Sequence, residues 1–236
     1  MRTKSDAPSL AWRLNKLLRI DAMNLVILII FVFVVWSIIS HSIANPDRYL
    51  PSPMAVIESS FDMLYKGLLP SYFGDTIMRL VIGSMIGLSL GIPFGLLIGI
   101  NRTVADMFHP IMNFFQSISG IAILPIIVVW WGNSEKTVLA VILYTSFFPI
   151  AYNVLSGVRG IPLRYISSVR TLGASRYQII RDVLFPGAMP SIATGARLSI
   201  GFAWRAVIAG EMLAGREGLG WMIFTGQDAD RTSEVI

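Results

Sequence analysis

The sequence predicts an all-α, polytopic membrane protein. Of its 236 residues, 54% are hydrophobic and only 14% are charged, whereas soluble proteins average about 25% charged residues. Apolar runs of about 20 residues recur along the chain, and a helix of that length spans the hydrocarbon core of a bilayer. The basic residues gather on particular loops, which is a topology signal and does not indicate nucleic acid binding.

We expect five spans. The polar, basic segment 1–22 is assigned to the cytoplasm, and the apolar run after it is longer than the roughly 7–15-residue core of a secretion signal, so we expect it to be retained. Eleven of the 19 basic residues then lie inside, namely five at the N-terminus, Arg102 and five after the fourth span, as the positive-inside rule requires. The membrane domain would cover 23–236, with spans at about 23–43, 77–100, 107–131, 137–155 and 188–209.

Glycine recurs at every fourth position of the second predicted span. Residues four apart share one helix face, and a ridge without side chains lets another backbone approach closely where lipid gives no hydrophobic drive for association. We interpret this ridge as a helix-packing surface, with a pore-lining seam as the alternative. Its members are Gly83, Gly87, Gly91, Gly95 and Gly99. The third span is interrupted by Ser119-Gly120 and by Pro125.

The longest polar interruption of the apolar second half is 167–190, SSVRTLGASRYQIIRDVLFPGAMP. Apolar residues recur at i+3 up to Gly173, which predicts one short helix that ends there. Ser175 followed by Gln178 is a capping-box pattern and predicts that a second helix begins at once. Its apolar side is predicted to be Tyr177, Ile180 and Leu184. Arginines keep this bent segment, 156–187, on the water side, which indicates a docking surface.

The spacing from Gly173 over nine residues to Val183-Leu184-Phe185-Pro186 resembles the EAA loop of type I ABC importer permeases. The consensus of that loop is E-A-A, three residues, Gly, nine residues, I-x-L-P, and Ser167-Ser168-Val169 stands here in place of E-A-A. Three further motifs resemble the nitrate/sulfonate/taurine-type branch: Leu50-Pro51-Ser52-Pro53, Gly210-Glu211-Met212-Leu213 and Gly218-Leu219-Gly220-Trp221. By this resemblance, the residues that couple to an ATPase are Ser167, Arg170, Gly173, Ala174, Ser175, Arg176 and Pro186.

The resemblance implies a multi-pass permease of the bacterial cytoplasmic (inner) membrane with a cytoplasmic N-terminus. It implies as partners a second permease subunit in a homodimer, two ABC ATPases, an extracytoplasmic substrate-binding protein and membrane lipid. No G-x-x-x-x-G-K-[ST] loop occurs, so we expect no cofactor on this chain, with ATP and Mg held by the partner ATPase. The family carries a sixth helix, and we expect Val235-Ile236 to be its beginning, with the rest cut off.

The residue types for catalysis or metal binding are scarce. Cysteine is absent and the only histidines are His41 and His109, so we expect no metal site. Neither H-E-x-x-H nor G-x-S-x-G occurs, and we expect no catalytic residue. The alternatives to a permease are a membrane-embedded enzyme and a non-transporting channel or scaffold subunit, and co-purification of a soluble ATPase would separate them.

Arg197 and Arg205 in the fifth span predict a translocation path for an anionic solute, with Trp204 and Glu211 as further candidates. The two arginines differ by about 80° around the helix and by about 12 Å along it, so they share a broad face. A guanidinium within a bilayer normally faces a partner charge or a water-filled path, and its fork fits an oxyanion. The alternatives are that Arg197 reaches the inner headgroups and that Arg205 pairs with Glu211 or a neighbouring subunit. Glu211 is either a structural and gating residue or a plain outer-surface charge.

Overall fold

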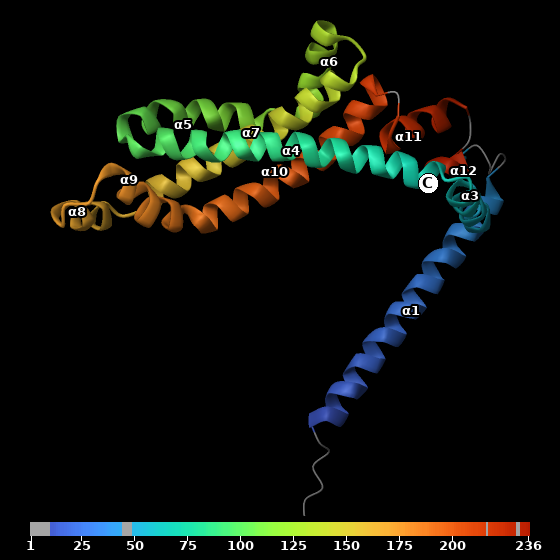
Figure 1. Cartoon of the computed structure of the whole chain (residues 1–236). Helices are drawn as coiled ribbons and strands as arrows, with labels where there is room; N and C mark the ends of the chain where they lie inside the picture. The colour runs from blue at the N-terminus through green and yellow to red at the C-terminus, as the bar shows by residue number, and fades with distance from the viewer. Residues whose placement is uncertain (1–9, 44–48, 216, 230–231) are drawn as a thin grey trace, which may run out of the picture. The chain divides into compact units, whose positions relative to one another are not determined.

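The computed structural model describes residues 10–43, 49–215, 217–229 and 232–236, and the elements in these ranges are helices (Figure 1). The contacts divide the chain into an N-terminal unit, residues 1–63 with 226–236, and a core unit, residues 64–225. The helices are α1 (Leu10–Ser42), α3 (Pro53–Tyr65), α4 (Leu68–Ile100), α5 (Arg102–Ser117), α6 (Gly120–Trp131), α7 (Glu135–Gly160), α8 (Leu163–Thr171), α9 (Arg176–Ile179), η1 (Ile180–Leu184, a π-helix), α10 (Phe185–Ala214), α11 (Leu219–Asp228) and α12 (Thr232–Val235).

The N-terminal unit contains one long apolar helix and a capped turn. Residues 23–42 of α1 are apolar enough to cross a membrane and are almost entirely unburied, as expected of a helix whose side chains meet lipid. In the last turn of α1, the Ser40 hydroxyl donates to the Leu50 carbonyl at 2.8 Å. The Ser52 hydroxyl accepts from the Ala55 amide at 3.3 Å, and Pro53 is the first residue of α3. The LPSP motif is thus a helix start, with a side-chain cap followed by proline.

Among the described residues, three helices are individually long and apolar enough to span a membrane, and up to five spans result if two bent pairs each count as one. One pair is α5 with α6, bent by 87°, and the other is 176–214 with α11, bent by 47°. The predicted third span, about 107–131, is therefore not one straight helix, because it bends by 87° where α5 gives way to α6. The break falls at Ile118 and Ser119, both of which have extended backbone, whereas Pro125 lies inside α6 without ending it.

The glycine ridge of α4 lies directly against α7. A Cβ built on Gly91 would lie 2.4 Å from Ile150 Cγ2, and one on Gly95 would lie 2.7 Å from the Ala151 carbonyl oxygen. Gly83, Gly87 and Gly99 meet α7 in the same way, and all five glycines are buried. The two helices approach to a distance that only glycine permits, which is the geometry of helix packing without a hydrophobic drive.

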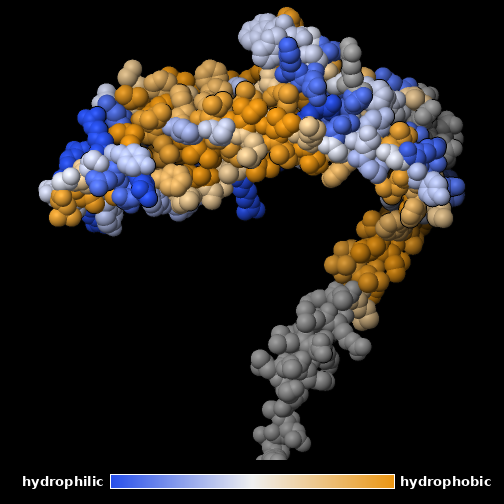
Figure 2. All heavy atoms as spheres, viewed as in Figure 1, coloured by the Kyte–Doolittle hydropathy of each residue, from blue (hydrophilic) through white to orange (hydrophobic). Residues whose placement is uncertain are grey.

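Helix α7 is the centre of the core unit, because α4, α5, α6 and α10 all contact it. Small residues also make the contact with α10: a Cβ on Gly195 would lie 2.7 Å from Asn153 Cβ. The buried Ser199 hydroxyl donates to the Ser146 carbonyl at 2.9 Å. Figure 2 shows a hydrophobic middle of the core unit, with hydrophilic residues at the end that carries α8 and α9 and at the end that carries α11.

The glycine ridge makes a testable prediction about stability. We expect Gly91→Ala to lower the free energy of unfolding by about 1–3 kcal/mol, because the added methyl group overpacks the contact with Ile150. Gly74→Ala on the same helix is the matched control, since nothing lies within 4 Å of that position. The control should be neutral or more stable by up to about 1 kcal/mol, because alanine is the better helix former. Thermal unfolding in detergent measures both, and equal midpoints for the two variants would contradict the packing role.

Candidate functional site

Residues 163–184, comprising α8, α9 and η1, form the bent unit that the sequence predicts. Gly173 has φ +83°, in the left-handed region. Its amide donates to the Arg170 carbonyl at 3.0 Å, and the Ala174 amide donates to the Val169 carbonyl at 3.1 Å. These two bonds are a Schellman motif, so the predicted helix end at Gly173 is confirmed. No atom lies within 4 Å of a Cβ at Gly173, and the constraint there is therefore backbone conformation and not space.

The capping box that begins the second helix of the bent unit is also confirmed. The Ser175 hydroxyl accepts from the Gln178 amide at 3.3 Å, and the Ser175 amide donates to the Gln178 side-chain oxygen at 2.7 Å. After one turn of α-helix the chain widens into the π-helix η1, which continues into α10. π-Helical turns are rare, and they are found frequently at functional sites. The bent unit is thereby joined to α10 without a loop.

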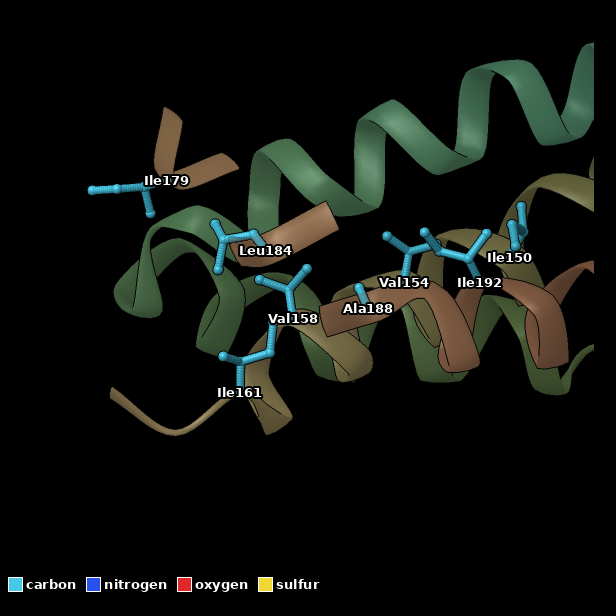
Figure 3. Packing of buried hydrophobic residues seen from close by; sticks show 8 residues of the cluster. All are labelled: Ile150, Val154, Val158, Ile161, Ile179, Leu184, Ala188 and Ile192. Carbon is cyan, nitrogen blue, oxygen red and sulfur yellow. The ribbon is translucent and has the colours of Figure 1, made fainter. Parts of the chain in front are cut away.

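Two buried side chains of the bent unit pack against α7 and α10. Ile179 and Leu184 are buried in a cluster with Val154, Val158 and Ala188, and Figure 3 shows this cluster as a row from Ile179 at one end to Ile150 at the other. The predicted apolar side of the second helix was partly wrong, because Tyr177 is exposed and Ile179 is buried instead. The π-helix has more residues per turn than an α-helix. An apolar pattern with the α-helical period of 3.6 residues, extended across 180–184, therefore assigns Tyr177 to the buried face although it lies on the exposed one.

The outward surface of the bent unit is basic and carries exposed apolar side chains. Leu172, at its tip, is 86% exposed, and Tyr177 and Leu163 are exposed as well. Exposed apolar residues rimmed by polar ones mark an interaction surface. Of the seven predicted coupling residues, Ala174 is partly buried and the others are exposed: Ser167, Arg170, Gly173, Ser175, Arg176 and Pro186.

A cavity of about 270 Å³ lies at the break between α5 and α6. Tyr144 of α7 stabilises this break, because its hydroxyl donates to the Phe115 carbonyl at the end of α5 at 2.6 Å. The start of α6 packs closely on α7: a Cβ on Gly120 would lie 2.2 Å from Thr145 Cγ2. The side chain of Ser119 makes no capping hydrogen bond, and helix geometry leaves the first amides of α6 without an intrahelical partner.

Arg205 of α10 lines this cavity, together with Phe115, Phe148 and Phe202. Its guanidinium carbon lies 6.0 Å from the centre of the Phe202 ring, at the outer limit of a cation–π contact. Arg197 and Trp204 are exposed on α10 and do not line the cavity. Of the four predicted path residues, the structure therefore places Arg205 alone at this cavity.

Glu211 lies elsewhere, at the end of α10 far from the bent unit, and it is fully buried. Its carboxylate accepts hydrogen bonds from the Thr76 hydroxyl at 2.9 Å, from Arg79 Nη1 at 3.0 Å and from the Gly220 amide at 3.0 Å. Glu211 is therefore not a plain surface charge, because it is fully buried, and its arginine partner is Arg79 and not Arg205. The gating role of Glu211 stays a prediction.

Thr76 and Arg79 were not singled out from the sequence. The sequence did contain a signal for Arg79, because this residue lies two residues inside the predicted second span. An arginine within a membrane span needs a partner of opposite charge or a polar environment, which marks it as a candidate. Thr76 has no such signal, since its importance comes from contacts with residues more than 130 positions away. Within the described ranges, no group of three or more His, Cys, Asp or Glu side chains converges in a way that would hold a metal ion.

Comparison with known proteins identifies the family. The model of the binding-protein-dependent transport system inner membrane component family matches residues 91–235. The chain is 29% identical to the taurine transport system permease protein TauC of Escherichia coli K12, over 95% of this chain and 82% of that protein. It is 32% identical to the nitrate import permease protein NrtB of Synechocystis sp., over 86% of this chain and 76% of that protein.

A third relative is the putative aliphatic sulfonates transport permease protein SsuC of Bacillus subtilis, which is 26% identical over 87% of this chain and 74% of that protein. Among solved structures, an inward-facing form of the MetNI methionine ABC transporter matches with a TM-score of 0.59 and 21% identity, over 74% of this chain and 90% of that chain. This likeness shows a shared fold. The chain belongs to the binding-protein-dependent transport system inner membrane component family, and it is a membrane-embedded permease subunit of an ABC importer and not an enzyme.

Proposed function

We propose that this permease imports a small anion and that the cavity at the α5–α6 break is where the anion passes. The observation that carries the proposal is the Arg205 guanidinium at a cavity beside a broken membrane helix. A cavity of about 270 Å³ is slightly smaller than the sites of drug-sized ligands, which run from about 300 to 1,000 Å³. A small solute fits this volume.

Two kinds of donor meet at this cavity. Arg205 presents a planar fork that bonds an oxyanion at two points. The start of α6 presents backbone amides at the positive end of a helix dipole, which favours anions. Taurine, aliphatic sulfonates and nitrate, which appear in the names of the relatives, all carry an oxyanion group. Because the compounds in these names share that group, they support an oxyanion as the substrate of this permease.

The exposure of Arg205 and Arg197 supports a second permease subunit against this face of α10. Within the part of the chain described, neither guanidinium has a carboxylate partner, and a guanidinium facing lipid would be expensive. A facing subunit with a water-filled path between the two would relieve that cost. The proposed assembly is a homodimer of permeases with two ABC ATPases, which bind ATP and Mg, and an external substrate-binding protein.

The bent unit is the proposed contact with the ATPase. Its exposed tip offers basic and apolar side chains, and its inner side is fixed to α7 and α10 by Ile179 and Leu184. Because η1 runs directly into α10, a displacement of the bent unit moves the helix that carries Arg205. ATP binding and hydrolysis would thus change the access to the cavity from one side of the membrane to the other.

The proposed topology places the N-terminus and the bent unit in the cytoplasm. The chain has no cysteine, so single introduced cysteines report orientation cleanly. We expect an impermeant maleimide to label Trp130→Cys from outside intact cells, and to label Leu172→Cys only in inside-out vesicles. Both positions are exposed in the structure. Labelling of Leu172→Cys in intact cells would reverse the assignment.

The role of the bent unit is tested at Gly173. We expect Gly173→Val to insert and assemble but to reduce ATP-driven uptake at least about tenfold, because a β-branched residue strongly resists positive φ. Gly173→Asn is the matched control, since asparagine tolerates the left-handed conformation, and it should keep most of the activity. Uptake by the complete importer at equal membrane levels is measured, and normal uptake by the valine variant would overturn the coupling role.

The role of Arg205 is tested by uptake of taurine, an alkanesulfonate and nitrate at matched membrane levels. For whichever of these the wild type transports, we expect Arg205→Gln to raise the apparent KM about tenfold or more, because a charge-assisted hydrogen bond is lost. Arg205→Lys should be intermediate, since lysine keeps the charge and lacks the fork. Arg197→Gln on the same helix is the control and should stay near wild type. Transport of none of the three anions, or wild-type kinetics in both Arg205 variants, would contradict the proposal.

A further inference from the structure

The fully buried Glu211 carboxylate of α10 contacts residues of α4 and α11. Figure 1 shows α11 at the end of the core unit opposite α8 and α9. Thr76 and Arg79, one turn apart on α4, donate to one carboxylate oxygen each. The Gly220 amide of α11 donates to the same oxygen as Thr76. We call Thr76, Arg79, Glu211 and the amides of Leu219 and Gly220 the Glu211 clasp.

The Glu211 clasp is the cap of α11. The Leu219 amide donates to the Thr76 hydroxyl at 2.9 Å and the Gly220 amide donates to Glu211, so side chains from two other helices satisfy the first turn of α11. Gly218, the residue before α11, has no room for a capping side chain, because its φ is +115° and a Cβ there would lie 2.4 Å from the Glu211 carboxyl group. The start of α11 therefore depends on α4 and α10 staying together.

Arg79 extends the clasp to the loop before α11 and to α7. Its Nη1 also donates to the Glu217 carbonyl at 2.8 Å, and its Nε donates to Glu135 at 3.3 Å, at the start of α7. A Cβ on Gly220 would lie 2.2 Å from the Ile208 carbonyl oxygen, so the backbones of α10 and α11 touch. Separating these helices would leave a buried carboxylate without its donors, which is strongly unfavourable.

We propose that Thr76 and Arg79 are positioning residues that hold α4, α10 and α11 together through Glu211, so that these helix ends move as one body during transport. Helix α10 connects the bent unit at one end to the Glu211 clasp at the other, over 30 residues and about 45 Å. A displacement that enters α10 from the ATPase side then reaches α4 and α11 at the far end. This inference rests on the coupling role proposed for the bent unit.

The first test compares Thr76→Val with Thr76→Ser in the complete complex with its ATPase and binding protein. Valine has nearly the same side-chain volume as threonine but lacks the hydroxyl that bonds both Glu211 and the Leu219 amide. Serine keeps this hydroxyl and lacks the methyl group. We expect Thr76→Val to assemble and to hydrolyse ATP at the basal rate, while stimulation of ATP hydrolysis by the binding protein falls about fivefold or more, because a buried hydrogen bond to a charge is lost. Thr76→Ser should be stimulated like the wild type. Full stimulation of Thr76→Val, or an equal loss in Thr76→Ser, would overturn the proposal.

The second test does not require Thr76→Val to fold. Spin labels on Met85→Cys of α4 and Leu213→Cys of α10, both exposed positions outside the Glu211 clasp, report the distance between the two helices in an otherwise cysteine-free chain. We expect the same distance in the nucleotide-free and in the ATP-plus-vanadate-trapped complex. A change of about one helical turn, roughly 5 Å, would show that the helices separate and would overturn the proposal.

Gly173→Val, measured in parallel, distinguishes a failure of this inference from a failure of the coupling role. If Gly173→Val is uncoupled and Thr76→Val is normal, the bent unit couples and the Glu211 clasp does not transmit. If Gly173→Val is normal, the coupling role fails, and the claim that α10 transmits its movement to the clasp fails with it. Uncoupling in both valine variants, with full activity in Gly173→Asn and Thr76→Ser, is the result that supports transmission along α10.

Discussion

The close contact between α4 and α7 is the constraint on which the rest of the core unit depends. Five glycines let the α4 backbone approach α7 so closely that a methyl group at Gly91 or Gly95 would collide with it. Lipid offers no hydrophobic drive for such an association, so packing and polar contacts must hold the helices. Once α4 is fixed on α7, α10 packs on α7 as well, and the positions of the cavity and of the Glu211 clasp follow.

Three polar sites of the core unit lie at different positions along α10. The bent unit is at its beginning, Arg205 meets the α5–α6 break farther along, and the Glu211 clasp is at its end. Each departs from regular helix geometry, through the π turn of η1, the extended backbone at Ser119 and the positive φ of Gly218. In a membrane, irregular backbone is tolerated only where it is buried in protein or lines a cavity. The break between α5 and α6 lines a cavity and the turn at Gly218 is packed against Glu211, so both of these fit that rule.

Arg79 of α4 differs from the two arginines of α10 in its hydrogen-bond partners. Arg79 has three acceptors, namely the Glu211 and Glu135 carboxylates and the Glu217 carbonyl. Arg205 and Arg197 are exposed on α10. A paired cation holds structure, whereas a cation that has no carboxylate partner among the described residues is the better candidate for contact with a partner subunit or an anionic solute. The proposed functions of the two sites follow from this contrast.

The sequence by itself determined the class of protein, the glycine ridge, and the helix end and capping box of the bent unit. Each of these depends on composition or on residues within a few positions of one another, and local sterics and hydrogen bonds decide them. Only the tertiary structure decided that α5 and α6 are separate helices at an 87° bend, that Tyr177 is exposed, and that Glu211 meets Arg79. A carboxylate has no preferred partner along the chain, and the packing of α4 against α7 and α10 selects Arg79 out of 15 arginines by bringing it within 3.0 Å.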